Sequence, residues 1–447
     1  MSKNTFYISC PIDTYSGYGA RSRDIAKAII ELDKYDVKIV PQRWGNTPMN
    51  FINDNSEWEF LKKHLYLEQK LTQQPDIWCM ITVPNEFQPV GKYNIGITAG
   101  IETTIAPGEW IEGCNRMNLI LGSSKHTIDV LRNSKWEKRN KQTNQSEGQL
   151  SWDKDGEILF EGADVETYKP LTSKDSKNIT INLDEVKEDF AYLFVGHWMQ
   201  GKLGEDRKNV GLLIKAFFET FKNKSKQPAL ILKTSQVGSS YVDREAILKK
   251  ILSIKNTCNS KKLPNIYLLH GEFTNNEINQ IYNHPKVKAM VCLTKGEGFG
   301  RPLLEFSLVN KPIITTNWSG HTDFLNPEYT TLLPGQMTKV HPSSANNMIL
   351  KDSKWFSVDT GQVGSFLKHV FENYKEYKEK AKRQGYQSRN NFSFDKMKEK
   401  IDEILSTKIP NIPKQVKLSL PKLKKIGEEK KQELPKLKLP KLKKVEV

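Results

Sequence analysis

The sequence predicts an α/β protein with two doubly wound parallel sheets. Short apolar runs alternate with segments of helical spacing through most of the chain, as expected when crossover helices join parallel strands. The 447 residues exceed what one hydrophobic core usually organises, which favours two domains. Glycine-rich and charged loops follow several apolar runs, where the carboxyl edge of a parallel sheet commonly binds ligands.

In the first half of the chain, apolar runs predict strands over 6–9, 37–40, 77–83, 93–98 and 119–122. Apolar residues at helical spacing predict a helix over 20–32. A second helix is expected over 125–131, because Ser123 and Ser124 stand where an N-cap belongs. The stretch 132–154 is polar and charged with little periodicity, so we expect an exposed, partly disordered loop there.

The alternation resumes in the second half of the chain. Apolar runs predict strands over 192–195, 230–233, 266–269, 289–293 and 312–316. Helical spacing predicts helices over 210–222, 243–254, 275–283, 302–309, 363–373 and 394–405. These elements predict a second doubly wound domain.

Composition shifts complete the expected organisation of the chain. The predicted parts are a first domain 1–170, a polar linker 171–188, a second domain 189–385, a C-terminal helix 386–407 and a tail 408–447. The sequence LPKLK occurs three times in the tail, at 420–424, 434–438 and 439–443. Recurrent proline prevents a continuous helix and the lysines repel one another, so the tail is expected to be disordered.

The positive charge is concentrated at the end of the chain. Residues 408–447 contain thirteen lysines and four glutamates, which account for +9 of the net charge of +16. Attraction to an anionic membrane surface, nucleic acid or an acidic protein is therefore expected mainly of the tail.

The lack of a recognisable targeting signal and the pattern of cysteines predict an intracellular protein. No apolar run approaches the ~20 residues needed to cross a bilayer, and the run 6–9 is too short for a signal peptide. The five cysteines are odd in number and far apart, which favours reduced thiols over disulfides or a zinc site. We expect a cytoplasmic protein whose tail allows peripheral attachment to a membrane surface.

The segment 297–305 reads EGFGRPLLE and follows an apolar run. Pro302 suits the first turn of a helix, so the glycines stand at a strand-to-helix turn. Glu297 and Glu305 flank this turn, and two carboxylates accept hydrogen bonds from several sugar hydroxyls. An ordinary glycine-rich turn between two solvated acids would give the same pattern.

Other loops also follow predicted strands. Arg207 and Lys208 place two cations between the run 192–195 and its helix, and a solvated basic loop is the alternative. Gly17 and Gly19 lie between the first strand and its helix. By contrast, the DxD string 153–155 lies in the polar stretch rather than at a strand end, so we treat it as chance and expect no metal.

EGFGRPLLE, with KPIITTNWSGHTDFL after it, resembles the Glu-x7-Glu signature of family 4 glycosyltransferases. The resemblance is strong over roughly 190–345 and loose over 1–130. It implies the GT-B fold, with two Rossmann-like domains facing a cleft and the last helix packing back toward the first domain. It also implies retaining transfer of a hexose from a nucleotide-diphosphate sugar, held by the second domain, to a hydroxyl acceptor held by the first.

The resemblance assigns roles to individual residues. The catalytic set that it implies is Glu297, Arg207 and Lys208, the two cations neutralising the departing diphosphate. The donor-binding set that it implies, for sugar, ribose and base, is Gly298, Phe299, Gly300, Glu305, Phe273 and Thr274. His321 is added because its loop follows a strand toward the same face and would reach the sugar or phosphate. Gly17, Gly19 and Glu102 are expected to line the cleft from the first domain, although a helix-capping role would also explain Glu102.

The acceptor is expected to be a saccharide or a lipid-linked glycan. Glycosylation of modified DNA bases is an alternative suited to a basic chain, but the body of the chain carries only +7. A non-catalytic nucleotide-sugar-binding scaffold is a second alternative, against which stand the intact Glu297, Lys208 and Glu305. The oligomeric state stays open.

Overall fold

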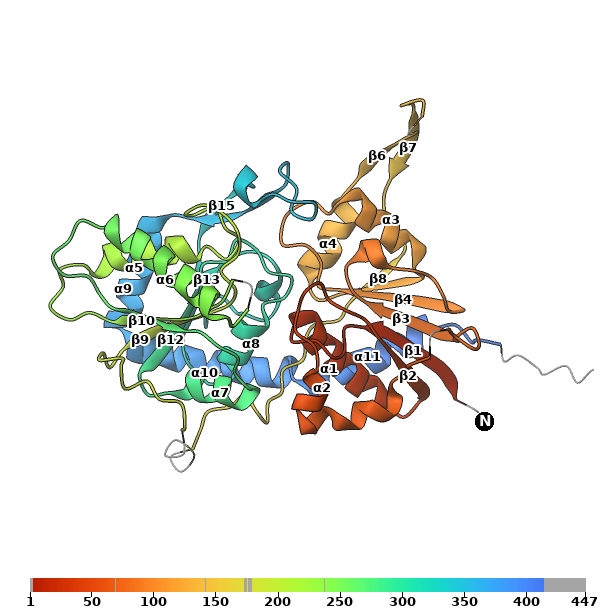
Figure 1. Ribbon diagram of the computed structural model, residues 1–447, viewed down its shortest axis with the longest axis horizontal. Coiled ribbons are helices and arrows are strands. Elements are labelled where there is room, and N and C mark those ends of the chain that lie inside the picture. Colours follow the sequence, from red (N-terminus) through yellow and green to blue (C-terminus); the bar gives the residue numbers. More distant parts are fainter. Residues whose placement is uncertain are drawn as a thin grey trace, which may run out of the picture. The chain divides into compact units, whose positions relative to one another are not determined.

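The computed structural model describes residues 3–68, 70–140, 142–172, 175, 179–236 and 238–413. The described residues up to 410 form one compact unit, and residues 411–413 lie outside it. The three LPKLK repeats, and all of the expected tail beyond 413, lie outside the described residues. The compact unit contains two six-stranded sheets, and we call the parts of the chain around them lobe one and lobe two (Figure 1).

Lobe one is built on a fully parallel sheet with the strand order β2-β1-β3-β4-β5-β8. Its strands are β1 (Asn4–Cys10), β2 (Tyr35–Pro41), β3 (Ile77–Ile81), β4 (Tyr93–Thr98), β5 (Leu119–Gly122) and β8 (Asp155–Ile158). Its main helices are α1 (Gly17–Glu31), α3 (Gly108–Arg116) and α4 (Lys125–Asn133), with a short helix α2 (Phe51–Asp54) and a 3-10 helix η1 (Ser56–His64). All five predicted strands are confirmed, with ends shifted by a few residues. The sixth, β8, was missed because its four residues DGEI are mostly polar.

The polar stretch 132–154 is not a plain loop, so that expectation was wrong in part. Strands β6 (Trp136–Arg139) and β7 (Ser146–Leu150) pair there as an antiparallel hairpin that projects from lobe one (Figure 1). Most of its residues are exposed, as predicted. Strands exposed on both faces lack the alternating apolar pattern by which a strand is normally recognised.

Lobe two repeats the parallel arrangement with the strand order β11-β10-β9-β12-β13-β14. Its strands are β9 (Ala191–Val195), β10 (Ala229–Lys233), β11 (Ile266–Leu269), β12 (Val287–Cys292), β13 (Ile313–Thr316) and β14 (Thr331–Leu333). Its helices are α5 (Val210–Phe221), α6 (Tyr241–Asn256), α7 (Asn275–Asn283), α8 (Arg301–Ser307) and α9 (Thr360–Glu372). Apart from β14, every one of these elements was predicted.

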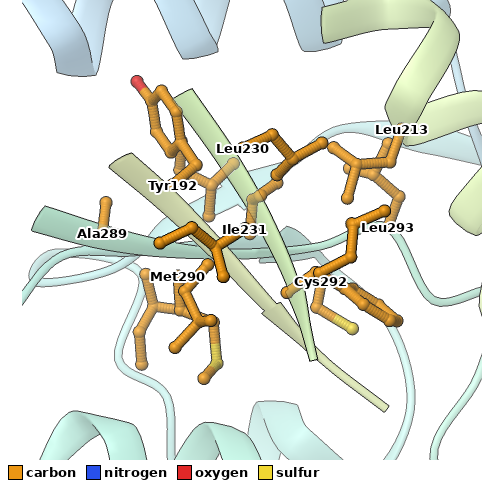
Figure 2. Close-up of a cluster of buried hydrophobic side chains, with 14 of the residues drawn as sticks. Tyr192, Leu213, Leu230, Ile231, Ala289, Met290, Cys292 and Leu293 are labelled. Atoms are coloured by element: carbon orange, nitrogen blue, oxygen red, sulfur yellow. The ribbon is translucent and has the colours of Figure 1, made fainter. Parts of the chain in front are cut away.

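Central strands of lobe two are apolar along their whole length because helices cover the sheet. Tyr192, Ile231 and Met290 come from three neighbouring strands and lie in one buried cluster (Figure 2). Leu213 of α5 packs against the same cluster. This continuous apolar pattern is what marks a strand buried on both faces.

The strand order reverses direction once in each sheet. β9 lies between β10 and β12, and β1 lies between β2 and β3, so successive crossovers leave these strands in opposite directions. The loops at the carboxyl ends of such strands diverge and leave a crevice, which is where open α/β sheets bind ligands.

The C-terminal part differs from the predicted single helix over 386–407. It contains α10 (Tyr374–Asn391) and α11 (Phe394–Lys408). Ser393 is the N-cap of α11, and its hydroxyl accepts from Lys396 N at 3.3 Å. α11 returns to lobe one and packs on α1, with Lys398 Nζ 2.7 Å from Glu31 Oε2. α10 was missed because only four of its eighteen residues are buried, which leaves almost no apolar stripe.

Two further segments complete lobe two. Strands β15 (Gly335–Lys339) and β16 (Lys354–Val358) form an antiparallel pair that was not predicted. Ala163 and Tyr168, which were expected to belong to the first domain, pack in the hydrophobic core of lobe two. The ring of Tyr168 lies 6.1 Å from that of Tyr282, so burial of this aromatic side chain places the chain in lobe two before residue 170.

The described helices include none that is long and apolar enough to cross a membrane. All five cysteines are buried and free.

Candidate functional site

The loops after β9 and β12 form the centre of the candidate site. These two strands pair directly, so the loop 196–209 lies beside the loop 293–300. Lys295 N donates to Arg207 O at 2.8 Å and joins the two loops through their backbones. Residues separated by about ninety positions in sequence are thereby held within hydrogen-bond distance of one another.

Arg207, Lys208 and Glu297 form a charge cluster at this junction. Lys208 Nζ lies 2.5 Å from Glu297 Oε1, and Arg207 Nη1 lies 3.5 Å from Glu297 Oε2. Arg207 Nη1 also donates to Gly296 O at 2.8 Å. The three side chains are only 10–14% exposed, so their charges interact with little screening by water.

The cluster decides the ionisation of Glu297. Burial acts to raise the pKa of this carboxyl, but the positive charges of Lys208 and Arg207 outweigh burial and lower the pKa to about 2. Glu297 is therefore a carboxylate at any physiological pH, able to accept hydrogen bonds.

Glu102 reaches the same cluster from lobe one. Its Oε1 lies 3.2 Å from Arg207 Nη2, so Arg207 is held by one carboxylate from each lobe. The residue before α3 is Pro107, and no side chain caps that helix. Of the two roles considered for Glu102, the structure favours the one facing lobe two.

The glycine-rich loop 296–300 lies directly against lobe one. Gly298 O accepts from Ser124 Oγ at 2.6 Å and from Ser123 Oγ at 3.1 Å. A Cβ atom on Gly298 would lie 2.3 Å from Ala99 O, and one on Gly296 would lie 2.2 Å from Glu102 O. These glycines are needed because any side chain would separate the loop from lobe one.

Phe299 and Gly300 complete the turn into α8. The Phe299 side chain is buried, with its ring 4.9 Å from that of Phe324, so only its backbone is left to contact a ligand. Gly300 has a φ of +98°, in the left-handed region that favours glycine.

Glu305, the second acid of the motif, is held by Arg301. Arg301 Nε donates to Glu305 Oε1 at 2.9 Å, and Arg301 Nη1 lies 2.5 Å from Asp24 Oδ2 of lobe one and 4.0 Å from Glu161 Oε2. Three carboxyl groups thus surround one guanidinium. Burial, opposed by Arg301, raises the pKa of Glu305 to about 7, because this guanidinium cannot compensate all three negative charges.

His321 is buried beside this loop rather than exposed to a ligand. Its exposed fraction is 0%, and its Nε2 lies 2.6 Å from Thr316 O, so that nitrogen carries the proton and donates. Burial lowers the pKa of the imidazole, which favours the neutral form. This hydrogen bond ties His321 to the end of β13 and so holds the loop 317–320 in place.

Phe273 and Thr274 lie in the loop between α7 and β11, an edge strand of lobe two. The Thr274 hydroxyl accepts from Glu277 N, and the Glu277 carboxylate accepts from Thr274 N, which makes a capping box for α7. Phe273 is partly buried, with Lys233 Nζ 5.5 Å from the centre of its ring. Neither side chain joins the charge cluster.

The two glycines of lobe one differ in how strongly the fold requires them. A Cβ atom on Gly19 would lie 2.3 Å from Thr14 O, so the turn into α1 needs this glycine. A Cβ atom on Gly17 would meet nothing within 4 Å. Both lie in the first turn of α1, where Ser16 Oγ accepts from Gly19 N.

Sequence reasoning missed several partners of the site. Asp24 and Glu161 gave no signal, because a single acid on a helix or in a loop is usually solvated. Arg301 stands inside the motif and could have been noticed as a cation between two acids. Ser124 was expected only to cap α4, and its contact with Gly298 required the packing of one lobe on the other.

Among the described residues, no group of three or more His, Cys, Asp or Glu side chains is arranged to hold a metal ion. The DxD string 153–155 lies at the amino end of β8, at the edge of the sheet opposite to the candidate site.

No family model matches this sequence, and no curated protein matches it. Solved structures do match it in three dimensions over both lobes. Anabaena HepE in complex with UDP and glucose is 13% identical with a TM-score of 0.57, and the match covers 90% of this chain and 99% of HepE. A glycosyltransferase from Rickettsia africae is 12% identical with a TM-score of 0.61, over 92% and 100% of the two chains.

Sucrose-phosphate synthase from Thermosynechococcus elongatus is 10% identical with a TM-score of 0.58, over 90% of this chain and 98% of that one. At such identities the likeness establishes the fold and nothing finer. The chain therefore has the GT-B fold, with two Rossmann-like parallel-sheet domains, as the sequence predicted.

Proposed function

We propose that this chain is a retaining glycosyltransferase that moves a hexose from a nucleotide-diphosphate sugar to a hydroxyl acceptor. The observation that carries the proposal is the buried cluster of Arg207, Lys208 and Glu297 at the adjoining ends of β9 and β12. Two cations and a carboxylate, placed where the strand order reverses, suit a ligand that combines a diphosphate with sugar hydroxyls. Structures of HepE hold UDP, glucose and UDP-glucose, so UDP-glucose is the first donor to test.

In the proposed reaction, the bond between the anomeric carbon and the diphosphate oxygen breaks, and a bond to the acceptor oxygen forms on the same face. The acceptor proton passes to the leaving phosphate oxygen, so the step needs no protein nucleophile. Arg207 and Lys208 stabilise the negative charge that develops on the diphosphate. Because these two cations supply that charge, we expect no metal to be required.

Glu297 has two tasks in this proposal. Without a donor it holds Lys208 and Arg207 in place, so little rearrangement is needed when the diphosphate arrives. When the diphosphate takes over part of this pairing, the carboxylate accepts hydrogen bonds from donor-sugar hydroxyls. The amides of Gly298, Phe299 and Gly300 line the same loop, and Glu305 is assigned to the ribose.

The test is donor binding followed by transfer. We expect one of UDP-, GDP- or ADP-glucose to raise the melting temperature of the full chain, and the product to keep the anomeric configuration of the donor by NMR. Lys208→Ala and Glu297→Ala should each lower the transfer rate by about 10²- to 10³-fold, as loss of one stabilising group commonly does. Lys202→Ala, an exposed cation of the same loop, is the matched control and should transfer as wild type does.

Other outcomes identify the alternatives. Donor binding without transfer to any acceptor would favour a non-catalytic scaffold, and wild-type rates in both variants would contradict the site. Loss of transfer in EDTA would contradict metal independence. Transfer to DNA with modified bases would favour the nucleic-acid alternative, and a chain ending at residue 407 would report whether the lysine-rich tail binds DNA or anionic vesicles.

A further inference from the structure

A concave site lies in lobe one, at the carboxyl ends of β1, β2 and β3. It is a cavity of about 430 Å³. Ser9, Trp78, Met80 and Thr82 line it and are buried, and they belong to β1, β3 and the residue after β3. Side chains that follow β2 and β3 form its exposed rim.

The position is the one at which an open parallel sheet binds ligands. β1 lies between β2 and β3, so the strand order reverses here, as it does at β9 in lobe two. Loops that diverge at such a reversal leave a crevice at the carboxyl edge. A volume of this order, lined by aromatic side chains and a few polar groups, is typical of a small-molecule site.

The lining of the cavity has a definite chemistry. Trp44 and Trp78 provide aromatic rings, which pack against the C–H face of a sugar ring. Ser9 and Gln42 provide a hydroxyl and an amide, with Gln42 Nε2 2.8 Å from Ser9 Oγ. These groups both donate and accept hydrogen bonds, as hydroxyl recognition requires.

The charge of the lining distinguishes between kinds of ligand. Arg43 and Glu86 are its two charged residues, so the formal charges cancel. The Thr82 hydroxyl donates to the Glu86 carboxylate, which fixes that carboxylate at the rim. Phosphorylated ligands and nucleic acid strands are normally met by an excess of Lys and Arg, which this cavity lacks.

The cavity is connected to the glycine-rich loop by direct contacts. The ring of Trp44 stacks on that of Tyr18, with centroids 4.1 Å apart. Tyr18 Oη accepts from Ala99 N at 3.0 Å and lies 3.1 Å from Thr98 Oγ1. Ala99 O is the atom nearest to a Cβ placed on Gly298. Ala99 therefore contacts both Tyr18 and the loop proposed for the donor sugar.

We propose that this cavity is the acceptor site and that it takes an uncharged saccharide ring stacked on Trp44. The proposal rests on the transferase function proposed above and narrows its acceptor from hydroxyl compounds in general to neutral carbohydrates. Trp44 positions the acceptor ring, and Glu86 accepts hydrogen bonds from its hydroxyls.

The experiment is saturation-transfer NMR on the full chain, with UDP present, using methyl glycosides of glucose, galactose, mannose and N-acetylglucosamine at millimolar concentration. An oligonucleotide that contains 5-hydroxymethylcytosine serves as the competing class of acceptor. Trp44→Ala and Glu86→Ala are the test variants. Trp58→Ala is the matched control, because Trp58 is a partly exposed tryptophan of lobe one outside the cavity.

At least one glycoside should give a signal in wild type, and its dissociation constant should rise about tenfold in Trp44→Ala, the loss expected for one stacking contact. Glu86→Ala, on the exposed rim, should weaken binding by several-fold even if Trp44→Ala fails to fold. Trp58→Ala should bind as wild type does. The proposal would be overturned if both test variants bound glycosides with the affinity of wild type, if no glycoside gave a signal, or if only the oligonucleotide bound.

A separate measurement shows which proposal has failed. The shift in melting temperature produced by UDP reports the donor site, and it should be the same in wild type, Glu86→Ala and Trp58→Ala. A UDP shift without glycoside binding contradicts the acceptor site alone. Glycoside binding that depends on Trp44, without response to any nucleotide, contradicts the transferase function and leaves the cavity a saccharide site.

Discussion

Glu297 and Glu305 are eight residues apart in one motif, yet their surroundings change their pKa values in opposite directions. Glu297 faces two cations, Lys208 and Arg207, which lower its pKa to about 2 against the effect of burial. Glu305 shares Arg301 with two other carboxyl groups, and burial raises its pKa to about 7. One acid of the motif is always ionised, and the other titrates near neutral pH.

Glu305 should make donor binding depend on pH. An ionised carboxylate accepts hydrogen bonds from two ribose hydroxyls better than the protonated acid does. The affinity for UDP-glucose should therefore rise, by up to about tenfold, between about pH 6 and about pH 8. Isothermal titration calorimetry would measure this, and UDP-glucose itself does not titrate in that range. In Glu305→Gln the affinity should be lower and independent of pH, and a wild-type profile that is flat would contradict the assignment.

The raised pKa of Glu305 also makes the stability of the folded protein depend on pH. Folded protein retains a proton on Glu305 between pH 4.5 and about 7 that the unfolded chain releases, so this group makes the free energy of unfolding fall as pH rises through that window. Donor binding favours the ionised Glu305 carboxylate, so bound donor should make this fall in the free energy of unfolding smaller.

Individual helices and strands differ in how clearly the sequence predicts them. Helix α7 was predicted at its observed bounds from apolar positions at helical spacing, and the structure adds a capping box of Thr274 and Glu277 at its start. Helix α10 and the β6–β7 hairpin were missed because both are largely exposed and have no apolar stripe to detect. Local patterns reveal an element only where burial has shaped its sequence.

Thr274 should act on stability through its helix. Thr274→Ala removes the hydroxyl that accepts from Glu277 N, and the loss of such a cap costs about 1 kcal/mol. The melting temperature should fall by a few degrees, while Thr274→Ser, which keeps the hydroxyl, should behave as wild type does. If the threonine side chain instead contacts the donor base, UDP affinity would drop in Thr274→Ala more than its stability does, which would contradict a purely capping role.

Across the molecule, two arginines of lobe two meet carboxylates of lobe one. Arg207 pairs with Glu102, and Arg301 pairs with Asp24. Gly298 lies between these pairs in sequence and accepts hydrogen bonds from Ser123 and Ser124 of lobe one. The loop proposed to hold the donor sugar is therefore also the surface on which the two lobes meet.

Arg301→Ala should destabilise the whole compact unit. It leaves Asp24, Glu161 and Glu305 without the guanidinium they share, and the loss of one partner of a buried pair costs about 3–5 kcal/mol. Calorimetry should show a lower melting temperature, with a larger loss at about pH 8 than at about pH 6, because protonation relieves the repulsion among the carboxyls. Arg139→Ala, which removes an exposed pair with Glu137, should leave the melting temperature unchanged.

Much of the site was predictable because its residues lie in recognisable turns. Glu297, Lys208 and the glycines were identified from loops that follow apolar strands, since the carboxyl edge of a parallel sheet gathers such loops. The partners that complete the site were not predictable, because Asp24 and Glu161 owe their importance to burial against residues far away in sequence.

Most of the buried strands and helices, the two-sheet architecture and the glycine-rich turn could be determined from the sequence, because periodicity and turn chemistry are local properties. The pairing of β9 with β12, the contact of Glu102 with Arg207 and the opposite pKa shifts of the two motif glutamates were decided only by the tertiary structure. The physical reason is that strand order, burial and the field of nearby charges depend on distances in space, which separation along the chain does not fix.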